Sequence, residues 1–169
     1  MKRILLLIAC LLLYVLTSCS GTLSEEETIS RSIGVSVDSG FIEEYTDTHG
    51  GFHGDGEAYA KIAFSDESFC DLVKDNPDWQ PLPLPKTLKV VLYGGTLDNG
   101  DSWSSFIENE NDTPQLPDIS DGYYFFKDRY SGGTDEKDVS VIFERYSMNF
   151  TLAIYDTDSK TLYFYEIDT

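Results

Sequence analysis

Alternation of apolar and polar residues runs through much of the chain and predicts a β-sheet. The clearest case is residues 57–64, in which one face carries only apolar side chains: Ala58, Ala60, Ile62 and Phe64. A period of two is the spacing of side chains that share one face of a strand. The same pattern predicts further strands at residues 33–37, 41–46, 123–129, 139–146, 149–155 and 161–167.

Helical spacing occurs in two short segments. Between Asp66 and Asn76, the residues Phe69, Leu72 and Val73 form a helical stripe that Pro77 ends. Residues 86–93 fit either a helix closed by Gly94 or a strand, and the helix is favoured. Because helices do not alternate regularly with the strands, we expect an α+β fold. It should contain a largely antiparallel sheet of about five to seven strands with one or two short helices.

The N-terminus has the pattern of an export signal. Lys2 and Arg3 precede 13 uncharged, mostly apolar residues at positions 4–16, whereas a membrane-spanning helix needs roughly 20. The segment Leu16-Thr17-Ser18-Cys19 resembles the lipobox of bacterial lipoproteins. This resemblance implies that diacylglycerol is attached to the Cys19 sulfur and that residues 1–18 are a cleaved signal peptide.

As a whole, the chain resembles small lipoproteins of Gram-positive bacteria, and the lipobox carries the resemblance. It implies a protein held at the cell membrane by a lipid anchor, on the extracytoplasmic face, and it brings no activity with it. Residues 20–32 are polar and acidic, so we expect residues 19–32 to form the lipidated Cys19 and a flexible tether. Residues 33–169 should form a single globular domain.

Charge limits the partners of this domain. Removal of residues 1–18 takes away two basic residues and no acidic ones, so the formal net charge falls from −18 to −20. Such a surface repels phosphate backbones, which excludes nucleic acid as a partner. Of the three cysteines, only Cys70 would remain unmodified in the mature chain, so no disulfide is expected within it.

One loop could bind a metal ion. Asp47, His49, His53 and Asp55 lie within nine residues, and His49 and His53 are the only histidines in the chain. Imidazole and carboxylate groups together suit zinc or another transition metal. Four glycines in residues 49–56 favour instead an ordinary turn with exposed histidines, so no cofactor is expected and a divalent metal is the alternative.

Aromatic residues lie on both faces of two predicted strands. Tyr123, Tyr163 and Tyr165 belong to the runs Tyr123-Tyr124-Phe125-Phe126 and Tyr163-Phe164-Tyr165. One face of each strand must pack in the hydrophobic core. The other is either covered by the helices, which is favoured, or an exposed platform for sugars or partner proteins.

Two functional hypotheses follow. The first is a non-catalytic binding or accessory domain at the cell envelope, which recognises a protein, peptide or polymer. The alternative is a metal-dependent hydrolase-like enzyme that uses His49, His53 and Asp55. The chain has no G-x-S-x-G or S-x-x-K serine motif and no phosphate-binding glycine loop, which favours the first hypothesis.

Overall fold

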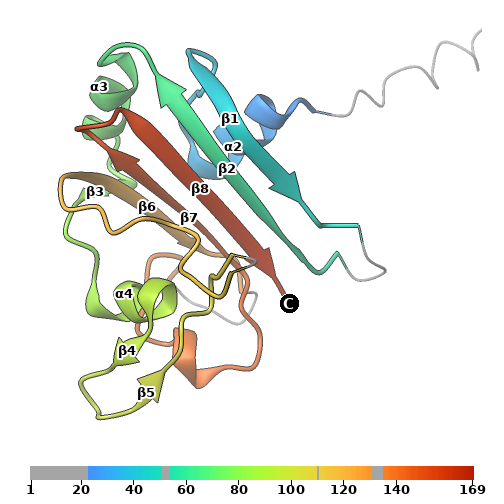
Figure 1. The fold of residues 1–169 in the computed structure, drawn as a ribbon, viewed down its shortest axis with the longest axis vertical. Helices are drawn as coiled ribbons and strands as arrows, with labels where there is room; N and C mark the ends of the chain where they lie inside the picture. The colour runs from blue at the N-terminus through green and yellow to red at the C-terminus, as the bar shows by residue number, and fades with distance from the viewer. Residues whose placement is uncertain (1–22, 51–53, 110, 131–134) are drawn as a thin grey trace, which may run out of the picture.

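A six-stranded antiparallel sheet forms the body of the protein in the computed structural model, which describes residues 23–50, 54–109, 111–130 and 135–169 (Figure 1). The strand order is β1-β2-β8-β7-β6-β3. The strands are β1 (Gly40–Asp47), β2 (Gly56–Phe64), β3 (Trp79–Pro81), β6 (Gly122–Asp128), β7 (Phe150–Asp156) and β8 (Thr161–Asp168). A two-stranded sheet contains β4 (Gly95–Thr96) and β5 (Ser102–Trp103).

Three α-helices occur in the described residues: α2 (Glu25–Ile33), α3 (Ser68–Lys74) and α4 (Lys86–Tyr93). A short 3-10 helix covers Ile142–Glu144. The α+β class and the antiparallel sheet are therefore confirmed, with one helix more than the sequence predicts. The helical interpretation of residues 86–93 is also confirmed.

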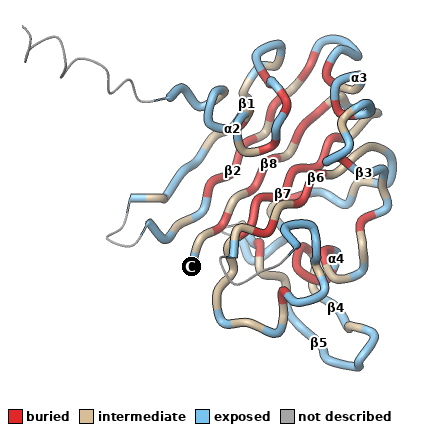
Figure 2. The backbone as a smooth tube through the Cα atoms, turned by 180° about the vertical axis from the view of Figure 1, so that it is seen from behind, coloured by how far each residue is buried: buried red, intermediate tan, exposed pale blue. Residues whose placement is uncertain are grey.

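The centre of the sheet is the hairpin of β7 and β8. Asp156 closes its turn by accepting hydrogen bonds from the backbone N–H of Asp158 at 2.9 Å and the Ser159 hydroxyl at 2.7 Å. All of β7 except Asp156 is buried, so both faces of this strand are covered (Figure 2). The sheet therefore separates two hydrophobic cores.

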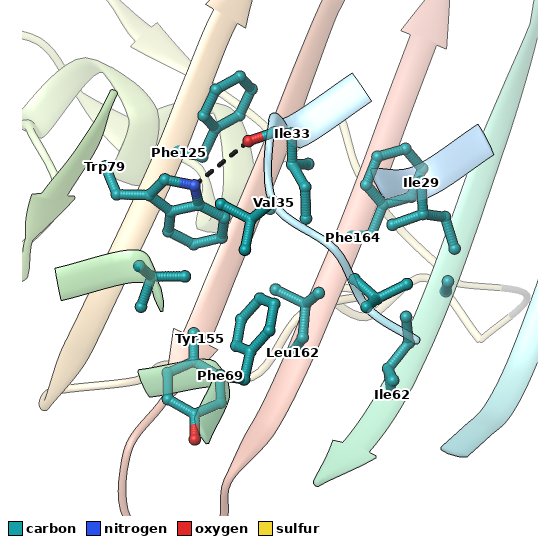
Figure 3. Packing of buried hydrophobic residues seen from close by; sticks show 14 of the residues in the cluster. Ile29, Ile33, Val35, Ile62, Phe69, Trp79, Phe125, Tyr155, Leu162 and Phe164 are labelled. Carbon is teal, nitrogen blue, oxygen red and sulfur yellow. Dashed lines mark hydrogen bonds between the residues drawn. The ribbon is translucent and has the colours of Figure 1, made fainter. Parts of the chain in front are cut away.

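Helices α2 and α3 cover the first face of the sheet. Ile29 and Ile33 of α2 are fully buried there, and Phe69 of α3 packs in the same core beside Tyr155 (Figure 3). The indole N–H of Trp79 donates a hydrogen bond of 3.3 Å to the carbonyl oxygen of Ile33. This bond joins the end of α2 to the edge strand β3.

Helix α4 and two long connections cover the second face. The buried side chains of α4 that pack there are Leu88, Val91 and Leu92. Ile107 and Leu116 come from the connection between β5 and β6, and Ile142 comes from the connection between β6 and β7. Loop residues and the 3-10 helix thus complete this core, and no further α-helix covers it in the described part of the chain.

The prediction of a flexible tether at residues 19–32 is wrong for the second half of that range, because residues 25–33 form α2. The Ser24 hydroxyl accepts a hydrogen bond from the Glu27 N–H at 3.2 Å, and the Glu27 carboxylate accepts one from the Ser24 N–H at 3.1 Å. This reciprocal pair is a capping box, which stabilises the first turn of a helix. Gly34 ends the helix with φ of 71°, a conformation that glycine adopts without strain.

Two of the predicted strands are also wrong. Residues 33–37 contain the end of α2 and a crossing segment whose valines, Val35 and Val37, are buried in the first core. Residues 139–146 contain the 3-10 helix instead of a strand. Neither segment can pair with β6 as a further strand, because β6 already pairs with β7 on one side and with β3 on the other.

The two edge strands differ from ideal strands. In β1, the pairing register with β2 shifts between Ile42 and Glu44, and Glu43 lies at the shift. At the other edge, β3 has three residues and ends with Pro81. Leu72 of α3, expected in a buried stripe, is half exposed, while Phe69 and Val73 are buried.

Ile29→Ala is expected to lower the free energy of unfolding by about 2–5 kcal/mol, because it leaves a cavity where α2 meets the sheet. Urea denaturation of a chain that begins at Ser20 measures this, since that chain includes every described helix and strand. Thr28→Ala, at an exposed position of the same helix, should change the free energy by less than about 0.5 kcal/mol. Equal effects of the two substitutions would contradict the packing of α2.

Candidate functional site

His49 is held at the end of β1 by the last residue of that strand. An Asp47 carboxylate oxygen accepts a hydrogen bond from the His49 backbone N–H at 2.8 Å. The same oxygen lies 2.8 Å from Nδ1 of the His49 ring. Partial burial would raise the pKa of the Asp47 carboxyl, but the hydrogen bonds from His49 outweigh it and lower that pKa below its ordinary value.

Gly56, the first residue of β2, allows the backbone of His49 to lie against the sheet. A Cβ atom at Gly56 would lie 2.7 Å from the His49 nitrogen and 2.8 Å from its Cα. Both distances are shorter than non-bonded atoms tolerate, and both involve backbone atoms that cannot rotate away. Only glycine at this position is compatible with the observed placement of His49.

The imidazole ring of His49 reaches the end of β8. Its Nε2 atom lies 3.3 Å from Oδ2 of Asp168. Ligand atoms of His49, Glu166 and Asp168 all lie within 4.8 Å of one another, and all three residues are half-buried. The two acids continue the row of β8 side chains that starts with Leu162 and Phe164 in the first core.

Arg129 lies beside the same carboxylates. Its Nη1 atom is 2.9 Å from Oδ2 of Asp168 and 3.3 Å from Oε1 of Glu166. Its Nη2 atom donates hydrogen bonds of 3.2 Å to the carbonyl oxygens of Phe150 and Ile167. The guanidinium group therefore connects the ends of β7 and β8 and fixes the position of both acids.

The structure brings together only part of the loop predicted as a metal site. Asp47 and His49 are in contact, Asp55 is exposed, and His53 lies outside the described residues. His49 is not an exposed turn residue as expected, because its side chain is only 20% exposed. Sequence reasoning missed Glu166, Asp168 and Arg129, although the two acids are visible as polar residues in the alternating row of residues 162–168.

The three tyrosines considered as an exposed platform do not form one. Tyr165 is only 2% exposed and packs in the second core, and burial raises the pKa of its hydroxyl. Tyr163 is half-buried against the same core, and Tyr123 is half-buried against the first core. Tyr123 and Tyr163 thus pack against opposite faces of the sheet and share no surface.

A different set of aromatic residues lines an open groove with a volume of about 660 Å³. Its aromatic members are Trp103, Phe106, Phe143 and Tyr146. The ring centre of Trp103 lies 5.9 Å from that of Phe106 and 5.0 Å from that of Phe143. Trp103 is 39% exposed and Tyr146 is fully exposed, so part of this aromatic surface faces solvent.

Polar groups adjoin the aromatic surface of the groove. Glu144, Arg145 and Thr169 also line it. The Arg145 side chain is only 7% exposed and forms an ion pair with Asp128, which is 2% exposed. Its guanidinium carbon lies 4.8 Å from the ring centre of Tyr130, a cation–π distance. Arg145 is therefore fixed in place at the wall of the groove.

Cys70 is not arranged as a nucleophile. It lies in α3, which follows the Phe64 end of β2, whereas His49 packs against Gly56 at the other end of that strand. The eight intervening residue steps correspond to roughly 26 Å of strand. Burial raises the pKa of the Cys70 thiol, which disfavours the reactive thiolate.

Comparisons with models of protein families, with curated proteins and with solved structures found no match for the chain. The geometry of the His49 cluster and of the aromatic groove is therefore the basis for a functional assignment.

Gly56→Ala is expected to destabilise the protein by about 1–3 kcal/mol, because the new methyl group collides with the backbone of His49. Gly50→Ala is the matched control, since a Cβ atom at Gly50 would meet no atom within 4 Å. It should change the free energy of unfolding by less than about 0.5 kcal/mol. Urea denaturation of both variants measures the difference, and a neutral Gly56→Ala would contradict the close approach.

Proposed function

We propose that this protein is a lipid-anchored, extracytoplasmic binding domain whose aromatic groove binds an uncharged carbohydrate chain of the cell envelope. The observation that supports this is the groove at Trp103, where aromatic faces and fixed polar groups meet on an open surface. Exposed aromatic surface of this kind is typical of binding sites. The domain acts by binding, and no step of catalysis is part of the proposal.

The chemistry of a sugar ring fits this groove. A pyranose ring presents apolar C–H groups on its faces, which pack against the flat side chains of Trp103 and Tyr146. Its hydroxyl groups lie around the ring edge and need hydrogen-bonding partners such as Glu144 and Thr169.

Charge favours an uncharged polymer over an ionic one. The formal net charge of −18, which becomes −20 when residues 1–18 are removed, disfavours anionic polymers near the surface. Within the groove, Glu144 and Arg145 have opposite charges, and Arg145 is already neutralised by Asp128. Glu144 is the one acidic side chain among the described residues that line the groove, so a cationic ligand finds no cluster of acids there.

The lipobox at Leu16–Cys19 supports the proposed location at the cell membrane. In the described part of the chain, none of the helices has the length and apolar character that a bilayer crossing requires. Two acyl chains on Cys19 would hold the protein stably at the membrane without further contacts.

Tryptophan fluorescence offers a direct test of the groove. Trp79 is only 4% exposed, so among the two tryptophans Trp103 is the one that a ligand can reach. Titration with uncharged glucan, cellulose and chitin oligosaccharides should change the emission of the wild-type chain. Trp103→Ala should weaken binding by at least about tenfold, or about 1.4 kcal/mol, measured by calorimetry.

Two controls make this test specific. Trp103→Phe keeps an aromatic face and should retain most of the affinity while it removes the fluorescence change. Phe41→Ala removes a 72% exposed aromatic side chain on β1, outside the groove, and should leave binding unchanged. Binding of an apolar peptide in place of every oligosaccharide would contradict the proposed ligand.

Cys19→Ala is expected to release the protein from the membrane fraction, because the mutant has no sulfur to carry lipid. Fractionation of cells that express the wild type and the Cys19→Ala variant measures this. Cys70→Ala is the control and should remain in the membrane fraction. Mass spectrometry that finds an unmodified Cys19 on a retained signal would contradict the lipid anchor.

A further inference from the structure

We propose that His49, Glu166 and Asp168 bind a divalent transition-metal ion, with Zn²⁺ as the best fit. The ligands are Nε2 of His49 and one carboxylate oxygen from each acid. This site lies on the opposite face of β8 from the aromatic groove, and it does not depend on the proposed carbohydrate ligand.

The hydrogen bonding of His49 leaves Nε2 available as a ligand. The 2.8 Å contact between Nδ1 and the Asp47 carboxylate places the proton of the neutral ring on Nδ1. Nε2 then carries a lone pair, is shielded from solvent, and has no hydrogen-bond partner among the described residues. A carboxylate that orients a histidine through its second nitrogen is a common feature of metal sites.

Asp168 places a second candidate ligand atom beside His49. Its Oδ2 lies 3.3 Å from Nε2, but the contact lacks hydrogen-bond geometry. Two lone-pair atoms this close repel each other, and Arg129, whose Nη1 atom lies 2.9 Å from Oδ2, offsets part of this repulsion. Tetrahedral zinc with bonds of about 2.0–2.1 Å places neighbouring ligand atoms about 3.4 Å apart. The 3.3 Å between Nε2 and Oδ2 agrees with this spacing, and the ligand atom of Glu166 lies within 4.8 Å of both.

The local charge fits a divalent ion. Asp47, Glu166 and Asp168 contribute three negative charges, and Arg129 contributes one positive charge. The net of two negative charges on these half-buried and exposed groups equals the charge of one Zn²⁺. A protonated His49 would supply only one positive charge.

Arg129 orients the ligands in this arrangement. A carboxylate oxygen has two lone pairs, so Oδ2 of Asp168 can accept from Arg129 and still face His49. Thr151 donates a hydrogen bond of 3.0 Å to Oε2 of Glu166, which fixes the second acid. The three ligands among the described residues leave a fourth position of the tetrahedron open, as in other open zinc sites.

Calorimetric titration of the chelator-treated chain from Ser20 with Zn²⁺ tests the proposal. We expect one equivalent to bind, and Co²⁺ to bind with the visible absorption of a four-coordinate ion. His49→Ala should weaken Zn²⁺ binding by at least about 100-fold, and Asp47→Asn by about 10–100-fold, as for other residues that orient a ligand. Asp168→Asn should weaken it by at least about tenfold.

Matched controls separate this site from the neighbouring loop and from the groove. Asp55→Asn and Trp103→Ala should leave Zn²⁺ affinity unchanged. Circular dichroism of each variant shows whether it is folded, and Asp47→Asn, at an exposed position, tests the site without a change of ligand. The proposal is wrong if the wild type binds neither Zn²⁺ nor Co²⁺. It is also wrong if folded Asp168→Asn binds Zn²⁺ normally.

Discussion

Burial of the β7–β8 hairpin on both faces is the constraint that organises the molecule. Tyr155 packs into one core and Ile154 into the other, so neither face of the sheet can be left to solvent. The chain satisfies this requirement with α2 and α3 on the first face and with α4 and loops on the second. The N-terminal segment is needed for this reason, since without Ile29 and Ile33 the first core loses its cover.

The end of β8 connects the two candidate sites. Because side chains alternate along a strand, Ile167 and Thr169 line the aromatic groove, while Glu166 and Asp168 point to the His49 cluster. Arg129 holds this end of β8 in place, because it donates hydrogen bonds both to the Asp168 carboxylate and to the carbonyl oxygen of Ile167. A shift of β8 by one residue would exchange the two sets of side chains and remove both sites.

Local features could be predicted from the sequence, and features that depend on distant residues could not. The β7–β8 hairpin, α3 and α4 have their signals within a few residues. Helix α2 was obscured because three consecutive glutamates make residues 25–27 resemble a solvated tether, although Ser24 and Glu27 match the capping-box spacing. The His49 cluster joins strands far apart in sequence, and the groove collects aromatics from separate loops, so no window of sequence contains either.

The irregular edges of the sheet affect how copies of the protein behave when many are crowded together. An open edge presents a row of unpaired backbone donors and acceptors that can template a strand from a neighbouring molecule. The register shift at Glu43 interrupts that row on β1. On β3, the row is three residues long and Pro81 has no N–H to donate. Both edges therefore disfavour strand exchange, which keeps the sheets of adjacent molecules separate.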